Sequence, residues 1–226
     1  MKILVTGFEP FNQSNVNPSM EILKVLKAPK RTTLLTEVLP VEFKRSSERI
    51  RELLQIHRPD VVISLGQAGG RKEISVERVA INVDNCRSSN GKAILADNAG
   101  QIIIDEPIEV DGSPAYFSTL PIWSLVNAMD KMNIPAAVSN TAGTYVCNHV
   151  MYTVLYEADK RYPDMRAGFI HVPFMPEQVY DRDALASTAG TQTDMAGGPK
   201  DNLSPQYSMP IDQMIRAVQC AIDFMA

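Results

Sequence analysis

The chain of 226 residues has the length of one domain, and its contents of 45% hydrophobic and 21% charged residues are ordinary for a globular protein. Its net charge of −4, with no basic run, argues against a nucleic-acid partner. No apolar stretch approaches the roughly 18 residues that a membrane-spanning helix needs, and Met1 leads directly into a strand-like run rather than a signal peptide. We therefore expect one cytoplasmic domain, with neither a membrane nor a nucleic-acid partner.

The cysteines do not form the pattern of a disulfide framework. There are three of them, Cys86, Cys147 and Cys220, and none belongs to a CxxC pair that would indicate zinc. We expect no metal and no other cofactor.

Short apolar runs alternate with amphipathic segments in the first part of the chain. Asn17 and Pro18 predict the start of a helix, because Asn is a favourable N-cap and Pro suits the first helical position. Strand, helix and strand in this rhythm predict an α/β fold with a mainly parallel sheet. The predicted elements are strands over Lys2–Thr6, Thr32–Val41 and Val61–Leu65 and a helix over Phe43–His57.

Two of the predicted strands are followed by unusual loops. The first loop carries Phe8 and Phe11, which either fold back into the core or line a pocket. The second, from Gly66 to Gly70, has three glycines, which indicates unusual dihedral angles or a close backbone approach. Because ligands of α/β sheets bind beyond the carboxyl ends of the strands, we expect both loops on one rim of the site.

The next predicted strand, Ile74–Val83, has charged residues in its middle. A carboxylate such as Glu77 is costly inside a strand unless it is paired or functional. The alternative is a strand with one exposed edge, along which Glu77 and Arg78 meet solvent.

The second half of the chain continues the pattern of strands and helices. The polar segment Ser187–Tyr207 has no periodicity, and we expect it to be mobile, functional or oligomer-facing. The predicted elements are strands over Pro114–Leu120, Ala136–Val138 and Gly168–Val172 and helices over Ile122–Met132, Thr144–Tyr162 and Ile211–Met225.

Cys147 lies near the start of a predicted helix that follows a strand. Unpaired N–H groups and the positive end of the helix dipole favour a thiolate there, although Cys147 is equally explained as a small buried hydrophobe. A cysteine nucleophile needs a base, and His171, at the carboxyl end of a strand, is better placed than His57 or His149. Glu77 is the candidate to orient His171.

Four segments carry a family resemblance, and the spacing between Cys147 and His171 fits it as well. The segments are GFEPF at Gly7–Phe11 with Asn17-Pro18-Ser19 after it, GQAGGRKEISVERVAIN at Gly66–Asn82, SNTAGTYVCN at Ser139–Asn148 and FIHVPFMPEQ at Phe169–Gln178. Through them the chain resembles the type I pyroglutamyl peptidases, also called pyrrolidone-carboxylate peptidases.

The resemblance implies a three-layer α/β/α sandwich and a cysteine peptidase. The enzyme would release 5-oxoproline from peptides with an N-terminal pyroglutamate through a thioester acyl-enzyme, without a cofactor, and would form a homotetramer. By resemblance, Cys147 is the nucleophile, His171 the general base and acid, and Glu77 the residue that orients His171. The implied substrate-binding residues are Phe8, Phe11, Asn17, Gln67, Arg87 and Tyr145, with the Cys147 N–H as oxyanion donor and Arg87 close to it.

The sequence departs from the family pattern in three places. Asn12-Gln13 replaces a glycine pair, extra residues at Ser88–Ile94 bear on the register of Arg87, and Ser187–Tyr207 is longer than usual.

Two alternatives remain at this point. A nucleoside phosphorylase-like enzyme would use Arg71, Lys72 and Arg78 as anion ligands, and an inactive homologue would only bind pyroglutamyl peptides.

Overall fold

The structure is a computed structural model that describes residues 1–12, 14–88, 91–179 and 207–226. The expected long segment Ser187–Tyr207 therefore lies outside the described residues except for Tyr207, as do two residues of the expected insertion at Ser88–Ile94. Within the described ranges, none of the helices combines the length and the hydrophobicity needed to cross a membrane.

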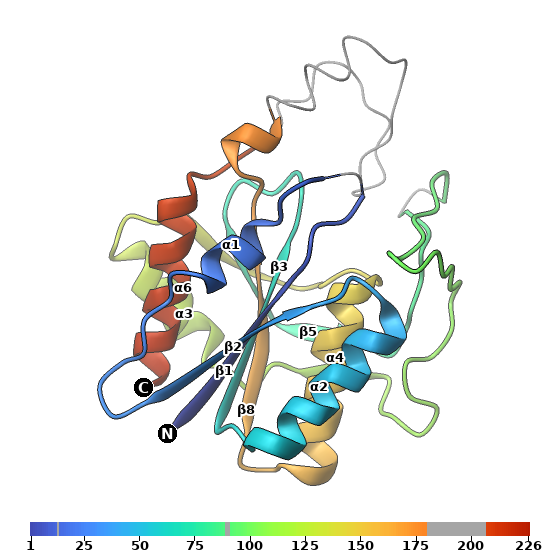
Figure 1. Cartoon of the computed structure of the whole chain (residues 1–226), viewed down its shortest axis with the longest axis horizontal. Coiled ribbons are helices and arrows are strands. Elements are labelled where there is room, and N and C mark those ends of the chain that lie inside the picture. Colours follow the sequence, from blue (N-terminus) through green and yellow to red (C-terminus); the bar gives the residue numbers. More distant parts are fainter. Residues whose placement is uncertain (13, 89–90, 180–206) are drawn as a thin grey trace.

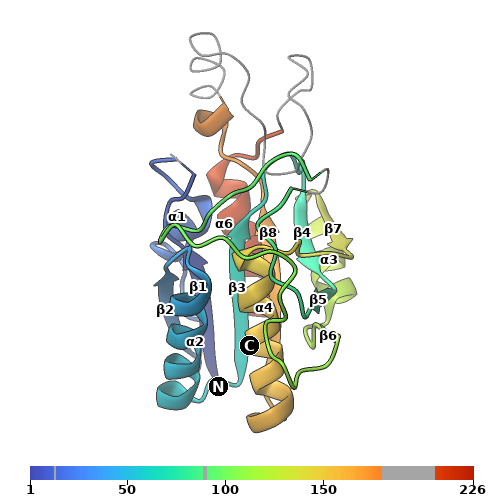
Figure 2. The same ribbon diagram turned by 90° about the vertical axis from the view of Figure 1, so that its right-hand side faces the viewer.

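A six-stranded sheet forms the middle layer, in the order β2-β1-β3-β8-β4-β7 (Figures 1 and 2). Neighbouring strands are parallel except β8 and β4, which are antiparallel. The predicted mixed, mainly parallel sheet is confirmed. The strands are β1 (Lys2–Phe8), β2 (Thr33–Leu39), β3 (Val61–Gln67), β4 (Ile74–Glu77), β7 (Ala136–Ser139) and β8 (Arg166–Val172).

Helices cover both faces of this sheet (Figure 2). One face carries α1 (Pro18–Leu23), α3 (Ile122–Asp130) and α6 (Ile211–Met225), and the other carries α2 (Phe43–His57) and α4 (Val146–Arg161). A separate two-stranded ladder of β5 (Val79–Ile81) and β6 (Ala115–Phe117) contacts α4.

The alternating side chains of the strands supply two cores. In β3, Val61 and Ile63 belong to the core under α1, α3 and α6, whereas Val62 belongs to the core under α2 and α4. Both cores are closed by fully buried helix residues, Ile222 of α6 on one side and Tyr152 of α4 on the other. This double burial explains why β3 begins with a continuous apolar run, Val61–Ile63.

The predicted strand Ile74–Val83 is wrong as a single element. It divides at Arg78 into β4 and β5, which belong to different sheets. The Arg78 N–H donates to the Ser139 carbonyl of β7, whereas the Arg78 carbonyl accepts from Ser118, just after β6. The chain thus changes sheets at one residue, and an alternating pattern that continues through that residue cannot reveal it.

The first and third strands are each two residues longer than predicted. As a result Phe8, Gly66 and Gln67 lie at the ends of β1 and β3 and not in loops. Helix α1 begins as predicted, because Asn17 caps it through a hydrogen bond from the Ser19 N–H and Pro18 is its first residue.

Candidate active site

Four residues from adjacent strands form a row across the sheet, here called the cross-strand row. Gly66 of β3 is paired in register with His171 of β8, His171 with Ser75 of β4, and Ser75 with Ala137 of β7. Paired residues in a sheet project to the same face. For this row the face is the one under α4, because the His171 ring packs against Phe169, 4.7 Å between centroids, in the core of that face.

Cys147, the second residue of α4, rests on this row. A Cβ atom placed on Gly66 would lie 2.8 Å from the Cys147 Sγ and 2.8 Å from the Phe169 ring. Only glycine therefore lets the thiol approach β3 so closely. The thiol lies against the residue that is the direct strand neighbour of His171.

His171 is bound to the carboxylate of Glu77. The distance between His171 Nδ1 and Glu77 Oε1 is 2.7 Å, and the two residues are 4% and 0% exposed. With the Nδ1 proton donated to a carboxylate, the lone pair of the neutral ring is on Nε2, as a general base requires. The alternative of Glu77 on a solvent-exposed strand edge is wrong.

Arg71 neutralises the buried carboxylate and was missed as a member of the site. Its guanidinium lies 2.5 Å from Glu77 Oε1 and donates to the Thr141 carbonyl at 3.1 Å. A buried carboxylate needs a compensating cation, and an arginine six residues before Glu77 is the signal that could have identified the pair. The other carboxylate oxygen of Glu77 is buried without a hydrogen-bond partner among the described residues.

Burial sets the direction of the pKa shift of Cys147 and His171, but not that of Glu77. Burial lowers the pKa of His171 below its ordinary value, against the opposing effect of the Glu77 hydrogen bond. Burial also raises the pKa of the Cys147 thiol to about 12, and the negative charge of Glu77 adds to the effect. For Glu77, burial raises the pKa, but the hydrogen bond and charge of His171, with the charge of Arg71, outweigh it and leave the pKa below its ordinary value.

The resting site therefore holds a thiol, a neutral imidazole and a carboxylate. The start of the helix favours a thiolate, but burial and the negative charge of Glu77 raise the pKa of the thiol and oppose it. The backbone supports the other expectation for this position: the Cys147 N–H has no hydrogen-bond acceptor in the described part of the chain and is free to bind an oxyanion.

The aromatic residues expected at the site surround the same core. Phe8 is buried and its ring lies 6.4 Å from that of Phe169, whereas Phe11 is only partly buried against the same cluster. Tyr145, directly before α4, donates its hydroxyl to the Ala96 carbonyl at 3.0 Å. The two alternatives for the aromatic loop thus divide between its residues: Phe8 folds into the core, and Phe11 keeps a partly exposed face.

The polar residues expected to bind substrate differ in how many bonds their side chains already form within the protein. The side-chain oxygen of Asn17 accepts from Ser19 and its amide donates to the Glu9 carbonyl, so its polar groups hold the start of α1. The Gln67 side-chain oxygen accepts from Gln178 at 2.8 Å. Arg87 is exposed and forms no ion pair among the described residues.

A second buried pair holds the start of α4 but was not expected. His149 Nδ1 lies 2.7 Å from Asp84 Oδ2. The neighbouring Asn148 side chain is fully buried and makes three hydrogen bonds, one with the Ile81 N–H and two with the carbonyls of Ile81 and Val83. These contacts attach the first turn of α4, which carries Cys147, to the end of β5.

Two of the three residues of the phosphorylase alternative are engaged within the protein. Arg71 is bound by Glu77, and Arg78 donates to Asn140 at 2.7 Å while its guanidinium lies 5.5 Å from the centre of the Trp123 ring. In the residues that the structure describes, no group of three or more His, Cys, Asp or Glu side chains is placed to hold a metal ion.

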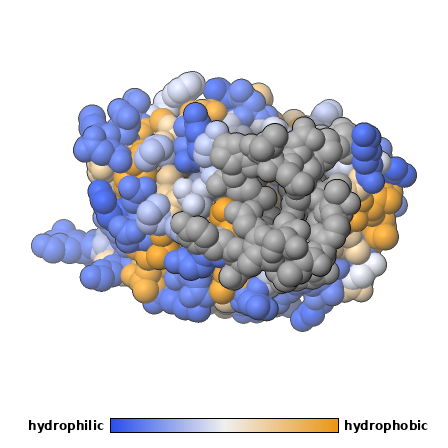
Figure 3. Space-filling view, turned by 90° about the horizontal axis from the view of Figure 1, so that it is seen from above, coloured by the Kyte–Doolittle hydropathy of each residue, from blue (hydrophilic) through white to orange (hydrophobic). Residues whose placement is uncertain are grey.

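Viewed from above, toward the end of the molecule where β1, β3 and β8 finish, the described surface intersperses hydrophobic with hydrophilic residues (Figure 3).

Comparison with known proteins identifies the family of the chain. The family model described as pyroglutamyl peptidase matches residues 1–226. A pyrrolidone-carboxylate peptidase of Streptococcus suis is 47% identical over 188 residues, which cover 83% of this chain and 84% of that protein. One from a Thermoanaerobacter species is 41% identical over 227 residues, covering 100% of this chain and 98% of that protein.

Solved structures agree. The crystal structure of pyroglutamyl peptidase I from Bacillus amyloliquefaciens has a TM-score of 0.82 at 36% identity and covers 98% of this chain and 95% of its own. A mutant pyrrolidone carboxyl peptidase from Pyrococcus furiosus reaches 0.84 at 38% identity, covering 99% and 97%. The chain belongs to the pyroglutamyl peptidase family.

Proposed function

We propose that this protein is a cysteine peptidase that hydrolyses the bond after an N-terminal pyroglutamyl residue, with Cys147 as nucleophile, His171 as general base and acid, and Glu77 as the residue that orients His171. One observation carries these roles. The Cys147 thiol lies against Gly66, the strand neighbour of a buried His171 that is hydrogen-bonded to Glu77, in a chain that belongs to the pyroglutamyl peptidase family.

The reaction follows from the resting protonation states. His171 Nε2 takes the Cys147 proton as Sγ attacks the carbonyl carbon that joins the pyroglutamyl residue to the rest of the peptide. The Cys147 N–H binds the oxyanion, and the imidazolium then gives its proton to the departing amine, which leaves a thioester. Water, deprotonated by His171, hydrolyses the thioester and releases 5-oxoproline and the thiol.

Glu77 matters most when the imidazolium forms. The carboxylate is already ionised and lies 2.7 Å from His171 Nδ1, so it stabilises the positive charge without any movement. Arg71 keeps that carboxylate ionised in the absence of the imidazolium.

The lactam ring would lie on the side of β1 and β3. Phe8 and Phe11 provide the apolar surroundings that a flat, uncharged ring requires, and Gln67 is the proposed polar partner of the lactam amide. Asn17 and Tyr145 contribute through the backbone that their hydrogen bonds hold. Arg87 is the proposed neighbour of the oxyanion.

The decisive experiment compares wild type with Cys147→Ser in the release of a fluorescent amine from a pyroglutamyl amide under reducing conditions. We expect Cys147→Ser to lose more than about 1,000-fold in kcat/KM, because a hydroxyl is a far weaker nucleophile at this position. Cys220→Ser is the matched control, since Cys220 lies on α6, on the other face of the sheet, and should retain full activity.

Thermal unfolding of both variants should match that of wild type. An inactive wild type would contradict the proposed reaction, and an active Cys147→Ser would contradict the assignment of the nucleophile.

We further propose that the chain acts in the cytoplasm as a homotetramer of single-domain subunits. A catalytic thiol needs reducing surroundings, and the three cysteines are free. Light scattering should give the mass of four chains of 25.0 kDa each.

A further inference from the structure

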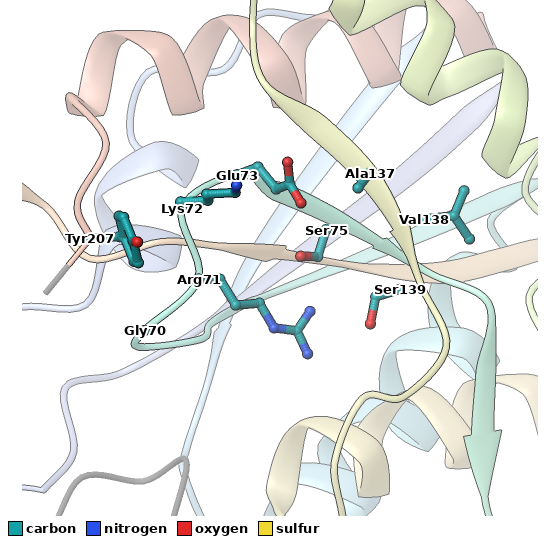
Figure 4. Close-up of a pocket in the computed structure, with 9 residues that line it drawn as sticks. All are labelled: Gly70, Arg71, Lys72, Glu73, Ser75, Ala137, Val138, Ser139 and Tyr207. Atoms are coloured by element: carbon teal, nitrogen blue, oxygen red, sulfur yellow. The ribbon is translucent and has the colours of Figure 1, made fainter. Parts of the chain in front are cut away.

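A cleft of about 460 Å³ opens beside the site, at the β7 edge of the sheet (Figure 4). Its walls come from the segment before β4, from β4 itself, from β7 and from Tyr207. The lining residues are Gly70, Arg71, Lys72, Glu73, Ser75, Ala137, Val138, Ser139 and Tyr207.

The cross-strand row leads from the nucleophile into this cleft. The row passes in order through Gly66 under the thiol, then His171, then Ser75, then Ala137, and its last two members line the cleft. Arg71 connects the two regions directly, because it lines the cleft and binds Glu77.

The position of the general acid determines which part of a substrate faces the cleft. A general acid has to lie within hydrogen-bonding reach of the leaving nitrogen, so the departing peptide extends from the acylated carbon toward the acid. Here the thiol lies over Gly66 and the acid is one strand further along the row. The pyroglutamyl residue and the departing peptide therefore lie on opposite sides of His171.

We propose that this cleft binds the residues that follow pyroglutamate in the substrate, so that the enzyme recognises the departing peptide as well as the lactam ring. The inference rests on the proposed peptidase function and deepens it. It makes Ser75, Ala137 and Lys72 determinants of selectivity for the second and third residues of the substrate.

The cleft offers the groups that an extended peptide needs. The Ser75 hydroxyl has no hydrogen-bond partner among the described residues. Strand β7 pairs only with β4 in the described sheet. The carbonyls of Pro135 and Ser139 point toward β4. Because the backbone groups of successive residues in a strand point to alternate sides, the N–H and the carbonyl of Val138 point away from β4. An exposed strand edge of this kind binds extended peptides through main-chain hydrogen bonds.

Two opposite charges line the cleft next to each other. Lys72 is exposed and forms no ion pair within the described residues, and Glu73 follows it (Figure 4). Because the charges of Lys72 and Glu73 nearly cancel, we expect the cleft to accept peptides whatever the charge of the residue after pyroglutamate. Reversing one of the two charges should create a preference for peptides of the opposite charge.

The first test fills the cleft. Ala137→Phe should lower the ratio of kcat/KM for pyroglutamyl-alanyl-alanine to kcat/KM for pyroglutamamide by about tenfold, because the amide releases only ammonia and places nothing in the cleft. An unchanged ratio would overturn the proposal, whether the two rates fall together or not at all.

The second test reverses a surface charge and does not depend on repacking. Lys72→Glu should shift selectivity by about fivefold from substrates with an acidic residue after pyroglutamate to substrates with a basic one. Lys30→Glu, an exposed site near β2 at the opposite edge of the sheet, is the matched control and should leave selectivity unchanged. If both variants behave alike, the cleft does not contact the peptide.

The same assays separate this inference from the function on which it rests. A wild-type protein that cleaves neither pyroglutamamide nor the peptide refutes the peptidase itself. A wild type that cleaves both, with variants that leave the ratios unchanged, refutes only the cleft.

Discussion

At the scale of single residues, burial determines how the nucleophile works. A thiol with a pKa of about 12 beside a histidine whose pKa is lowered forms a neutral pair at rest, in contrast to an ion pair assembled before the substrate arrives. The sulfur then loses its proton only during attack. At that moment the Cys147 N–H can stabilise the oxyanion, and Glu77 can stabilise the imidazolium.

This neutral pair predicts the pH dependence of the reaction. His171 has to be neutral to act as a base, and its lowered pKa keeps it neutral at pH values where an exposed histidine is half protonated. The acid limb of kcat/KM should therefore have its midpoint below about pH 6.5, with a plateau above it. Steady-state assays between pH 4 and pH 9 would test this, and a limb above that value would contradict a neutral resting imidazole.

The thiol gives an independent readout of the same states. Inactivation by iodoacetamide requires the thiolate, so its rate should still be rising at pH 9. A rate that reaches a plateau near neutral pH would show a preformed ion pair instead.

At the scale of elements, Asn148 makes most of the side-chain hydrogen bonds that attach the start of α4 to the end of β5. Asn148 satisfies a backbone donor and two backbone acceptors at and just after the end of β5. The position of Cys147, one residue earlier, depends on this attachment.

Asn148→Ala should cost about 2 kcal/mol of unfolding free energy, because it leaves partly buried backbone groups of Ile81 and Val83 without partners. It should also lower kcat, since the first turn of α4 loses its anchor. Urea unfolding and initial rates would measure the two effects, with the exposed Asn127→Ala on α3 as control. A loss of stability with unchanged kcat would show that the anchor is structural only.

At the scale of the whole molecule, only one of the two cores carries the site. Cys147, Phe169 and His171 lie on the face of α2 and α4, whereas α6 packs on the opposite face. The two cores lie on opposite faces of the same sheet and consist of different side chains.

Core mutations should therefore separate stability from activity. Ile222→Ala in α6 should destabilise the protein by about 2–5 kcal/mol and leave kcat/KM within about twofold at temperatures where it stays folded. Phe169→Leu should reduce both quantities, because this ring contacts His171 and lies at Gly66. If Ile222→Ala also reduced kcat/KM, the two faces would be coupled.

The sequence was sufficient for most of the elements and for the α/β class. Periodicity located α2 and α6 with the bounds that the structure has, because each buries one apolar stripe. It could not locate the break at Arg78, where the side-chain pattern continues while the backbone changes its hydrogen-bonding partner.

The site was predictable in part. The motifs predict Cys147, His171 and Glu77 as catalytic candidates. The roles of Arg71 and Asn148 could not be predicted, because they depend on which segments meet in space. The cross-strand row is likewise a consequence of strand order and register, which no local pattern records. Burial, and with it the protonation of the thiol, also becomes visible only in three dimensions.

The order of the strands has a consequence for how the protein acquires activity. β3 and β4 follow each other along the chain, yet β8 lies between them in the sheet, and Glu77 meets His171 across 94 residues. A nascent chain on the ribosome has to keep these two strands apart until β8 has been synthesised, because a premature hairpin would close the gap that β8 must enter. Catalytic competence should thus return as one of the last events in refolding, after the helices and the first three strands have formed.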